Sequence, residues 1–271
     1  MNQFQDKDAV ITGGASGIGL ATARALAAKG AKLVLADIEQ GPLDEAVAAF
    51  AAHGTPCLGV RCDVGDKADV DALADRAWNR FGAVHVVFNN AGVAVSGPTA
   101  EMTHADWEWL MRVNLWGPIH GVEAFVPRMI EQRQGGHVLF TASFAGLVPN
   151  VGLGPYCVTK YGVVALAEVL QKELRAHEIG VSVLCPMRVV TNIGSSERNR
   201  PADLGGPEAS AGVVDQSEDN PDQSGRVIPV EQVADQVVAA IEGNRLYVLP
   251  HEESKGFIEN RFRRILKTFD A

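Results

Sequence analysis

Apolar runs of strand length alternate with amphipathic helical stretches along most of this chain. The predicted strands span residues 9–11, 32–36, 57–62, 84–88, 137–141 and 181–185, and the predicted helices between them span 17–29, 43–52, 67–80, 104–132 and 156–177. Strands that alternate with helices join through right-handed crossovers, which place the strands in a parallel sheet with helices on both faces. The pattern therefore predicts an α/β fold, a doubly wound parallel sheet in three α/β/α layers. Because we find neither an internal repeat nor a second core, we expect residues 1–271 to form a single domain.

Charge and hydropathy exclude several classes of partner. The net charge is −9 at pH 7, whereas a nucleic-acid surface needs clustered Lys and Arg, so we expect no nucleic-acid partner. No stretch approaches the roughly 20 uninterrupted apolar residues of a membrane span. The N-terminus also lacks the basic and apolar regions of a signal peptide. We expect a soluble cytoplasmic protein.

The cysteines and histidines predict no metal site. Neither a Cys-x-x-Cys pattern nor the Cys/His spacing of a zinc site occurs among them. In a reducing compartment thiols stay unpaired, so disulfides are not expected. The four cysteines are Cys57, Cys62, Cys157 and Cys185.

Residues 193–228 interrupt the alternation of strands and helices. Gly, Ser and Pro are dense there, acidic residues outnumber basic ones, and no apolar period is sustained. A long irregular segment within a compact domain is usually functional or disordered. We expect a mobile insert on the substrate side, with a disordered surface insert as the alternative. A helix is predicted next over 230–241, then a short strand over 246–249 and an amphipathic C-terminal helix over 256–269.

A glycine-rich turn, with the letters TGGASGIG, follows the first predicted strand. Gly13, Gly17 and Gly19 allow a tight turn, a close approach of the backbone to a pyrophosphate, and close packing of helix on sheet. The helix that begins beside Ser16 and Ile18 directs its amides and its positive dipole end at the phosphates. The strand before and the helix after are the context of a Rossmann-like dinucleotide site. The alternative is a glycine-rich turn without a ligand.

An acidic residue ends the second predicted strand. The carboxylate of Asp37 can accept hydrogen bonds from both hydroxyls of the adenosine ribose, and it would repel a 2′-phosphate. Ser16 and Ile38 stand where an arginine could have reached that phosphate. The expected cofactor is therefore NAD rather than NADP. The alternative is an aspartate that faces solvent and caps the following turn.

These residues belong to an ordered set of motifs. The set comprises Thr12-Gly-x-x-x-Gly17-x-Gly19, Asp63-Val64, Asn89-Asn90-Ala91-Gly92, Asn114, Ser143 and Tyr156-x-x-x-Lys160. In their order and separations, they resemble the classical short-chain dehydrogenase/reductase family over nearly the whole chain. Each motif alone is common, whereas the ordered set is highly specific.

The chemistry of the last motif can be argued from the residues. Tyr156 and Lys160 are four apart on a predicted helix, so their side chains share one face. A free tyrosine has a pKa of about 10, too high for an efficient base at neutral pH. A nearby ammonium favours the phenolate, which we expect to lower the pKa of Tyr156. Ser143 follows the fifth strand at the carboxyl edge of the sheet, where open α/β sheets bind ligands.

The family resemblance implies a role for each motif. Tyr156 is the expected general acid/base, and Ser143 orients the substrate oxygen. Lys160 also binds the nicotinamide ribose, and Asn114 supports a water that relays protons to that lysine. The other implied cofactor contacts are Asp63 and Val64 at the adenine, Asn90, Ala91 and Gly92 in the central cleft, and Pro186, Val189 and Thr191 at the nicotinamide.

One segment departs from the family pattern. Pro186-Met187-Arg188-Val189-Val190-Thr191 stands where the family more often has Pro-Gly-x-Val-x-Thr. Met187 removes the backbone freedom of a glycine, and Arg188 puts a cation near the expected substrate side. The departure concerns the shape of the substrate pocket and not the reaction.

The expected function is oxidation of a secondary alcohol to a ketone, or the reverse, by hydride transfer. The expected substrate pocket is mostly apolar, which favours a hydrophobic or aromatic alcohol, and its residues are Val93, Ala94, Val95, Phe144, Leu147, Val148, Val151 and Leu153. Two other functions remain open: a catalytically silent NAD-binding sensor or scaffold on the same fold, and a lyase or epimerase that retains its cofactor. The family and the amphipathic C-terminal stretch imply a homo-oligomer, either a tetramer or a dimer, with membrane-surface docking of that stretch as the alternative.

Overall fold

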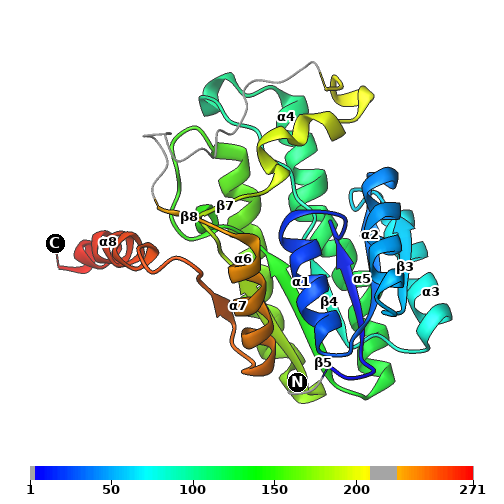
Figure 1. Ribbon diagram of the computed structural model, residues 1–271. Coiled ribbons are helices and arrows are strands. Elements are labelled where there is room, and N and C mark those ends of the chain that lie inside the picture. The colour runs from blue at the N-terminus through cyan, green and yellow to red at the C-terminus, as the bar shows by residue number, and fades with distance from the viewer. Residues whose placement is uncertain (1–3, 208–224, 271) are drawn as a thin grey trace.

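The computed structural model describes residues 4–207 and 225–270 (Figure 1). Seven strands form a parallel sheet in the order β3-β2-β1-β4-β5-β6-β9. They are β1 (Asp8–Thr12), β2 (Lys32–Asp37), β3 (Cys57–Arg61), β4 (Val86–Asn89), β5 (Gly136–Thr141), β6 (Ile179–Leu184) and β9 (Tyr247–Val248). β1 pairs with both β2 and β4, so the strand order reverses beside it. Open α/β sheets bind ligands at this reversal, outside the carboxyl ends of the strands.

Two layers of helices cover the sheet and confirm the expected fold class. Val10 and Val34 belong to one hydrophobic cluster, whereas Ile11 and Leu35 belong to another, because side chains along a strand alternate between its two faces. The first cluster joins the sheet to α3 (Lys67–Phe81), α5 (Gly117–Gln132) and α6 (Gly154–Glu173), and the second joins it to α1 (Gly17–Ala28), α2 (Gln40–Ala52) and α7 (Val230–Glu242).

The predicted continuous helix over 104–132 is divided in the structure. α4 (His104–Met111) leads into a π-helical turn, Arg112–Trp116, and α5 follows directly. Such a turn widens the helix by one residue and occurs frequently at functional sites. Asn114 lies in this turn, fully buried. Shorter 3₁₀ turns occur at Thr99–Glu101, Phe144–Gly146, Leu174–His177 and Lys267–Phe269.

The segment expected to be irregular begins and ends with regular structure. Two 3₁₀ helices, η5 (Asn192–Asn199) and η6 (Ala202–Leu204), follow the sheet. Near its two ends, β7 (Arg188–Val189) pairs in parallel with β8 (Val227–Ile228), outside the main sheet. Residues 208–224 of the expected insert lie outside the described residues.

A buried ion pair fixes the first part of this segment. Arg200 Nη1 lies 2.6 Å from Asp106 Oδ1, and both side chains are only 1% exposed. Asp106 also closes a capping box with Thr103 at the start of α4, so this carboxylate has several partners. Arg200 therefore attaches the chain directly after η5 to α4.

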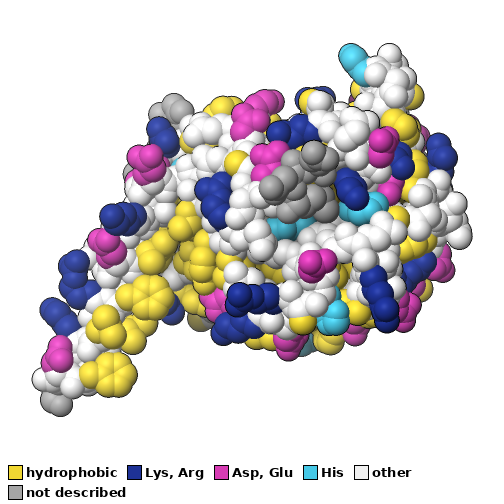
Figure 2. Space-filling model, turned by 90° about the horizontal axis from the view of Figure 1, so that it is seen from below, with side chains coloured by type: hydrophobic (Ala, Val, Ile, Leu, Met, Phe, Trp, Pro, Cys, Tyr) yellow, Lys and Arg dark blue, Asp and Glu magenta, His cyan; other side chains and the backbone are white. Residues whose placement is uncertain are grey.

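The C-terminal helix α8 (Ser254–Leu266) begins two residues earlier than predicted and projects from the body (Figure 1). Its first turns contact the core, since the ring of Phe257 meets that of Phe144 edge-on with 5.7 Å between centroids. Phe262 and Leu266 are exposed toward its far end, and Phe269 is exposed in the 3₁₀ turn that follows. Figure 2 shows an apolar stripe along the projecting helix. Among the described residues, no helix is long and apolar enough to cross a membrane.

Candidate active site

The glycine turn between β1 and α1 forms one wall of a cleft at the carboxyl edge of the sheet. Gly13 and Gly17 have φ angles of +62° and +52°, a backbone region that favours glycine. A Cβ on Gly19 would overlap the carbonyl oxygen of Gly13, so glycine is required for α1 to begin this close to the turn. Ser16 makes no capping hydrogen bond to the described amides of α1. Those amides are available to an anion, so the turn fits the pyrophosphate of a dinucleotide.

Most of the expected cofactor residues meet at this cleft. Gly19 instead packs behind the turn, and Pro186 and Val189 belong to the neighbouring segment after β6. Lys160 borders the cleft, because its ammonium donates to the carbonyl oxygen of Thr141 in the lining at 2.9 Å. The expected residues that line the cleft are Gly13, Ser16, Gly17, Ile18, Asp37, Asp63, Val64, Asn90, Ala91, Gly92 and Thr191.

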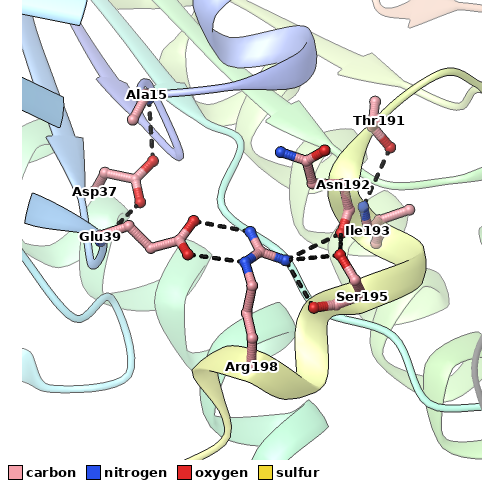
Figure 3. Close-up of polar contacts among 8 residues, drawn as sticks. All are labelled: Ala15, Asp37, Glu39, Thr191, Asn192, Ile193, Ser195 and Arg198. Carbon is pink, nitrogen blue, oxygen red and sulfur yellow. Dashed lines mark hydrogen bonds and ion pairs between the residues drawn. The ribbon is translucent and has the colours of Figure 1, made fainter. Parts of the chain in front are cut away.

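Asp37 ends β2 beside the glycine turn (Figure 3). Its Oδ2 accepts a hydrogen bond from the backbone N–H of Ala15 at 3.0 Å, and its Oδ1 accepts one from Glu39 at 3.1 Å. Burial raises the pKa of Asp37, and these two backbone bonds oppose that effect. The carboxylate therefore lies in the cleft wall and is oriented from both sides, rather than facing solvent as an ordinary turn cap.

An ion pair that the sequence did not reveal lies beside Asp37. Arg198 donates from Nε and Nη2 to the two carboxylate oxygens of Glu39, each at 2.8 Å (Figure 3). Arg198 lies on η5 and Glu39 follows β2, so the pair crosses the cleft between segments 159 residues apart. The hydrogen bonds from Arg198 are the main cause that lowers the pKa of Glu39. The expectation of no arginine near the ribose considered only positions 16 and 38.

Asn90 shapes the centre of the cleft through its side chain. Its Nδ2 donates to the carbonyl oxygens of Thr12 and Gly13, at 3.0 and 3.2 Å. Its Oδ1 accepts from the hydroxyl of Thr141 at 2.9 Å. Thus one amide joins the ends of β1, β4 and β5 and holds the glycine turn in place. Asp63 orders the next wall, since its Oδ1 accepts from the N–H of Gly65 at 2.8 Å.

Asn114 and Lys160 meet at Gly92. A Cβ on Gly92 would lie 3.3 Å from Asn114 Oδ1 and 3.5 Å from Lys160 Nζ. The Asn114 amide accepts from the N–H of Val93 at 2.9 Å and donates to its carbonyl at 2.8 Å. Asn114 therefore fixes the loop after β4 directly, in addition to any water that it holds.

Comparison with known proteins places this site in a family. The family model for short chain dehydrogenase matches residues 7–202. The CLA biosynthesis dehydrogenase/reductase of Lactiplantibacillus plantarum is 33% identical to this chain, over 98% of it and 95% of the relative. The C alpha-dehydrogenase of Sphingobium sp. strain NBRC 103272 / SYK-6 is 34% identical, over 98% and 87%. A crystal structure of a short-chain dehydrogenase/reductase from Burkholderia phymatum in complex with NAD aligns with a TM-score of 0.89 and 38% identity, covering 99% of this chain and 97% of that one.

The chain belongs to the short-chain dehydrogenase family. The expected family and the expected oxidoreductase class, which acts on CH–OH groups, are confirmed.

Burial governs the ionisation of Tyr156 in this short-chain dehydrogenase. It raises the pKa of Tyr156 to about 12, while hydrogen bonding with Ser143 opposes the rise. Burial also lowers the pKa of Lys160 to about 8. Lys160 Nζ lies 5.5 Å from the centroid of the tyrosine ring. A net lowering of the pKa of Tyr156, expected from the sequence, is not found in this structure, because loss of solvation has the largest effect.

The surroundings of Tyr156 are apolar. Tyr156, Val95, Trp109 and Leu204 belong to one buried cluster, together with residues of the loop after β4. Leu204 lies on η6, so this 3₁₀ helix packs in the same cluster as the tyrosine. Val151, expected in the pocket lining, is instead fully exposed.

The segment that departs from the family pattern is anchored on both sides. Phe144, next to Ser143, donates its N–H to the carbonyl oxygen of Pro186 at 2.8 Å. The N–H of Met187 donates to Nδ1 of the buried His251 at 3.2 Å. Arg188 is buried and donates to the carbonyl oxygen of Gly225 at 3.4 Å. Arg188 therefore contacts the chain just before β8.

Proposed function

We propose that this protein is an NAD-dependent dehydrogenase that interconverts a hydrophobic or aromatic secondary alcohol and its ketone. The carrying observation is that Ser143, Tyr156 and Lys160 lie together beside a cleft whose ribose end carries Asp37. The NAD complex of the similar Burkholderia phymatum enzyme supports NAD as the cofactor. A silent NAD-binding module would have no need of all three side chains.

Each residue has a distinct task in the proposed reaction. Bound NAD supplies the acceptor for the hydride. Tyr156 removes the hydroxyl proton of the alcohol, and Ser143, within hydrogen-bonding reach of Tyr156, holds the substrate oxygen. Lys160, with a pKa of about 8, exchanges protons near neutral pH and can return the tyrosine to its reactive state. Asn114 positions the loop after β4 through its two bonds to Val93.

The buried cluster around Tyr156 supports an apolar substrate. Val93 and Trp109 belong to the same apolar cluster as Tyr156 and also line the cleft, so part of the cleft wall is hydrocarbon and aromatic. Among the relatives, the 1-deoxy-11-beta-hydroxypentalenate dehydrogenase of Streptomyces avermitilis is 33% identical over 97% of this chain. Its name denotes a hydroxy compound as the substrate, which agrees with the alcohol proposed here.

A screen for NADH formation tests the proposal. The purified protein is given NAD and three classes of alcohol: steroids, aromatic carbinols and medium-chain hydroxy compounds. We expect the absorbance of NADH to rise as an alcohol of at least one class is oxidised. NAD binding without turnover on any class favours the silent sensor or scaffold. Conversion of substrate with no net NADH favours a lyase or epimerase that retains its cofactor.

Assembly and location extend the proposal. The exposed apolar residues of α8, among them Phe262 and Leu266, support a homotetramer or homodimer, and a monomeric mass by light scattering at micromolar concentration would exclude both. All four cysteines lie in the described part of the chain and are unpaired, which suits the cytoplasm.

The insert at 193–228 is proposed to close over the substrate, with Leu204 already packed near Tyr156.

A further inference from the structure

The Glu39–Arg198 ion pair is a preformed and doubly oriented contact. Two guanidinium nitrogens, Nε and Nη2, donate to the carboxylate of Glu39. The third nitrogen, Nη1, donates to the carbonyl oxygens of Ser195 and Asn192 at 2.7 and 3.2 Å. The side chains of Arg198 and Glu39 are 36% and 24% exposed. The arginine is thus held by its own helix and aimed at the carboxylate across the cleft (Figure 3).

The pair lies at the ribose end of the cleft. Asp37, Glu39 and Arg198 all line the same cavity, and Asp37 accepts the backbone N–H of Glu39. The attraction of Asp37 contributes to the raised pKa of Arg198, so the three charges lie within reach of one another. A phosphate on the 2′-oxygen of the ribose would therefore meet two carboxylates and one guanidinium. That guanidinium is occupied by Glu39.

We propose that Glu39 is a second determinant of cofactor choice, because it withholds Arg198 from the 2′-phosphate of NADP. A guanidinium fork binds carboxylate and phosphate with the same paired N–H groups, so the two anions compete for it. Asp37 acts by repulsion and by bonding the ribose hydroxyls, whereas Glu39 acts by occupying the guanidinium of Arg198. This role of Glu39 rests on the proposed function only in that Asp37 binds the adenosine ribose.

Two single variants separate this role from simple bracing of the cleft. Glu39→Gln removes one negative charge and releases the fork of Arg198, so NADP should bind about tenfold more tightly than to the wild type. Arg198→Gln leaves Glu39 as an unpaired carboxylate, so NADP should bind no better or more weakly. The double variant should lose the gain of Glu39→Gln. NAD affinity should change by less than about threefold in Glu39→Gln, since NAD carries no 2′-phosphate.

The measurement is equilibrium binding by calorimetry, with NAD, NADP, 2′,5′-ADP and 5′-AMP as ligands. The last two ligands differ only by the 2′-phosphate, and their binding requires no turnover, so a wrong substrate class would leave this result unaffected. Lys67→Gln serves as the matched control, because Lys67 pairs with Asp71 on the exposed surface of α3, away from the cleft. Unfolding temperatures of all variants establish that each is folded.

The outcomes are opposed. A gain for NADP and 2′,5′-ADP in Glu39→Gln that is absent in Arg198→Gln supports the proposal. If the pair only braces η5, both variants will weaken NAD and NADP by the same factor, and the proposal is wrong. Unchanged NADP affinity in Glu39→Gln would also overturn it, since a released guanidinium would then have no access to the phosphate.

Discussion

Replacing Lys160 by methionine should remove activity without destabilising the fold. The ammonium is 2% exposed, and its burial lowers the pKa from 10.5 to about 8. At pH 7 the lysine is charged in both the folded and the unfolded protein, and the pKa difference means that burying this charge lowers the stability by about 3 kcal/mol. Methionine has a similar length and no charge. It leaves the carbonyl oxygen of Thr141 without its 2.9 Å bond, which costs about 1–3 kcal/mol. The variant should therefore be equal to the wild type or up to about 2 kcal/mol more stable.

The pH dependence of unfolding distinguishes this explanation from ordinary repacking. Between the folded pKa of about 8 and the unfolded value of 10.5, the unfolded wild type binds more protons at Lys160 than the folded protein does. The contribution of Lys160 to stability therefore rises with pH across that window. Urea unfolding of both proteins at pH 7 and pH 10 measures it, and other groups cancel in the difference. Methionine should lose its relative advantage at pH 10. A loss of more than about 2 kcal/mol at pH 7, or a difference that does not change with pH, would refute the reasoning.

Four further perturbations test separate parts of the structure. Asp106→Asn should destabilise the protein by about 3–5 kcal/mol, because it leaves the guanidinium of Arg200 buried without its countercharge, and urea unfolding measures this. Asp37→Ser should weaken the preference for NAD over NADP, and similar kcat/KM for both cofactors in the wild type would show that Asp37 is misplaced. The rate of alcohol oxidation should rise with pH through the neutral range, because the phenolate of Tyr156, with a pKa of about 12, becomes more populated; a flat profile contradicts this. Shortening residues 201–223 to a brief Gly/Ser linker should lower kcat/KM for the alcohol while NAD affinity persists, whereas unchanged kinetics would leave the insert without a catalytic role.

Local patterns were sufficient for the sheet and for the cofactor turn. The apolar strands at Val10 and Val34 are recognisable because a central parallel strand is buried on both faces. The glycine spacing is recognisable because each position has a steric reason that depends only on its neighbours, such as the positive φ of Gly13 and Gly17. Asp37 could be placed because a strand end has a fixed position relative to the turn beside it.

Long-range contacts could not be read from the sequence. Arg198 lies on a short 3₁₀ helix far along the chain, so no local spacing connects it to Glu39. The buried pair of Arg200 with Asp106 also joins residues far apart in the sequence, 94 positions, and it attaches the start of the segment rich in Gly, Ser and Pro to α4. The π-helical turn at Asn114 lies inside a region that the sequence predicted only as helical. The ionisation of Tyr156 depends on how deeply the folded chain buries it, which spacing alone does not give.

The central claim, proton transfer by Tyr156, is tested most directly by Tyr156→Phe. The variant keeps the buried ring and removes only the hydroxyl. With NAD and an alcohol that the wild type oxidises, the initial rate of NADH formation should fall by at least about a hundredfold. The NAD dissociation constant, measured by calorimetry on the same preparation, should stay within about threefold of the wild type. Turnover close to that of the wild type, with NAD still bound, would contradict the assignment of Tyr156 as the acid/base of this dehydrogenase.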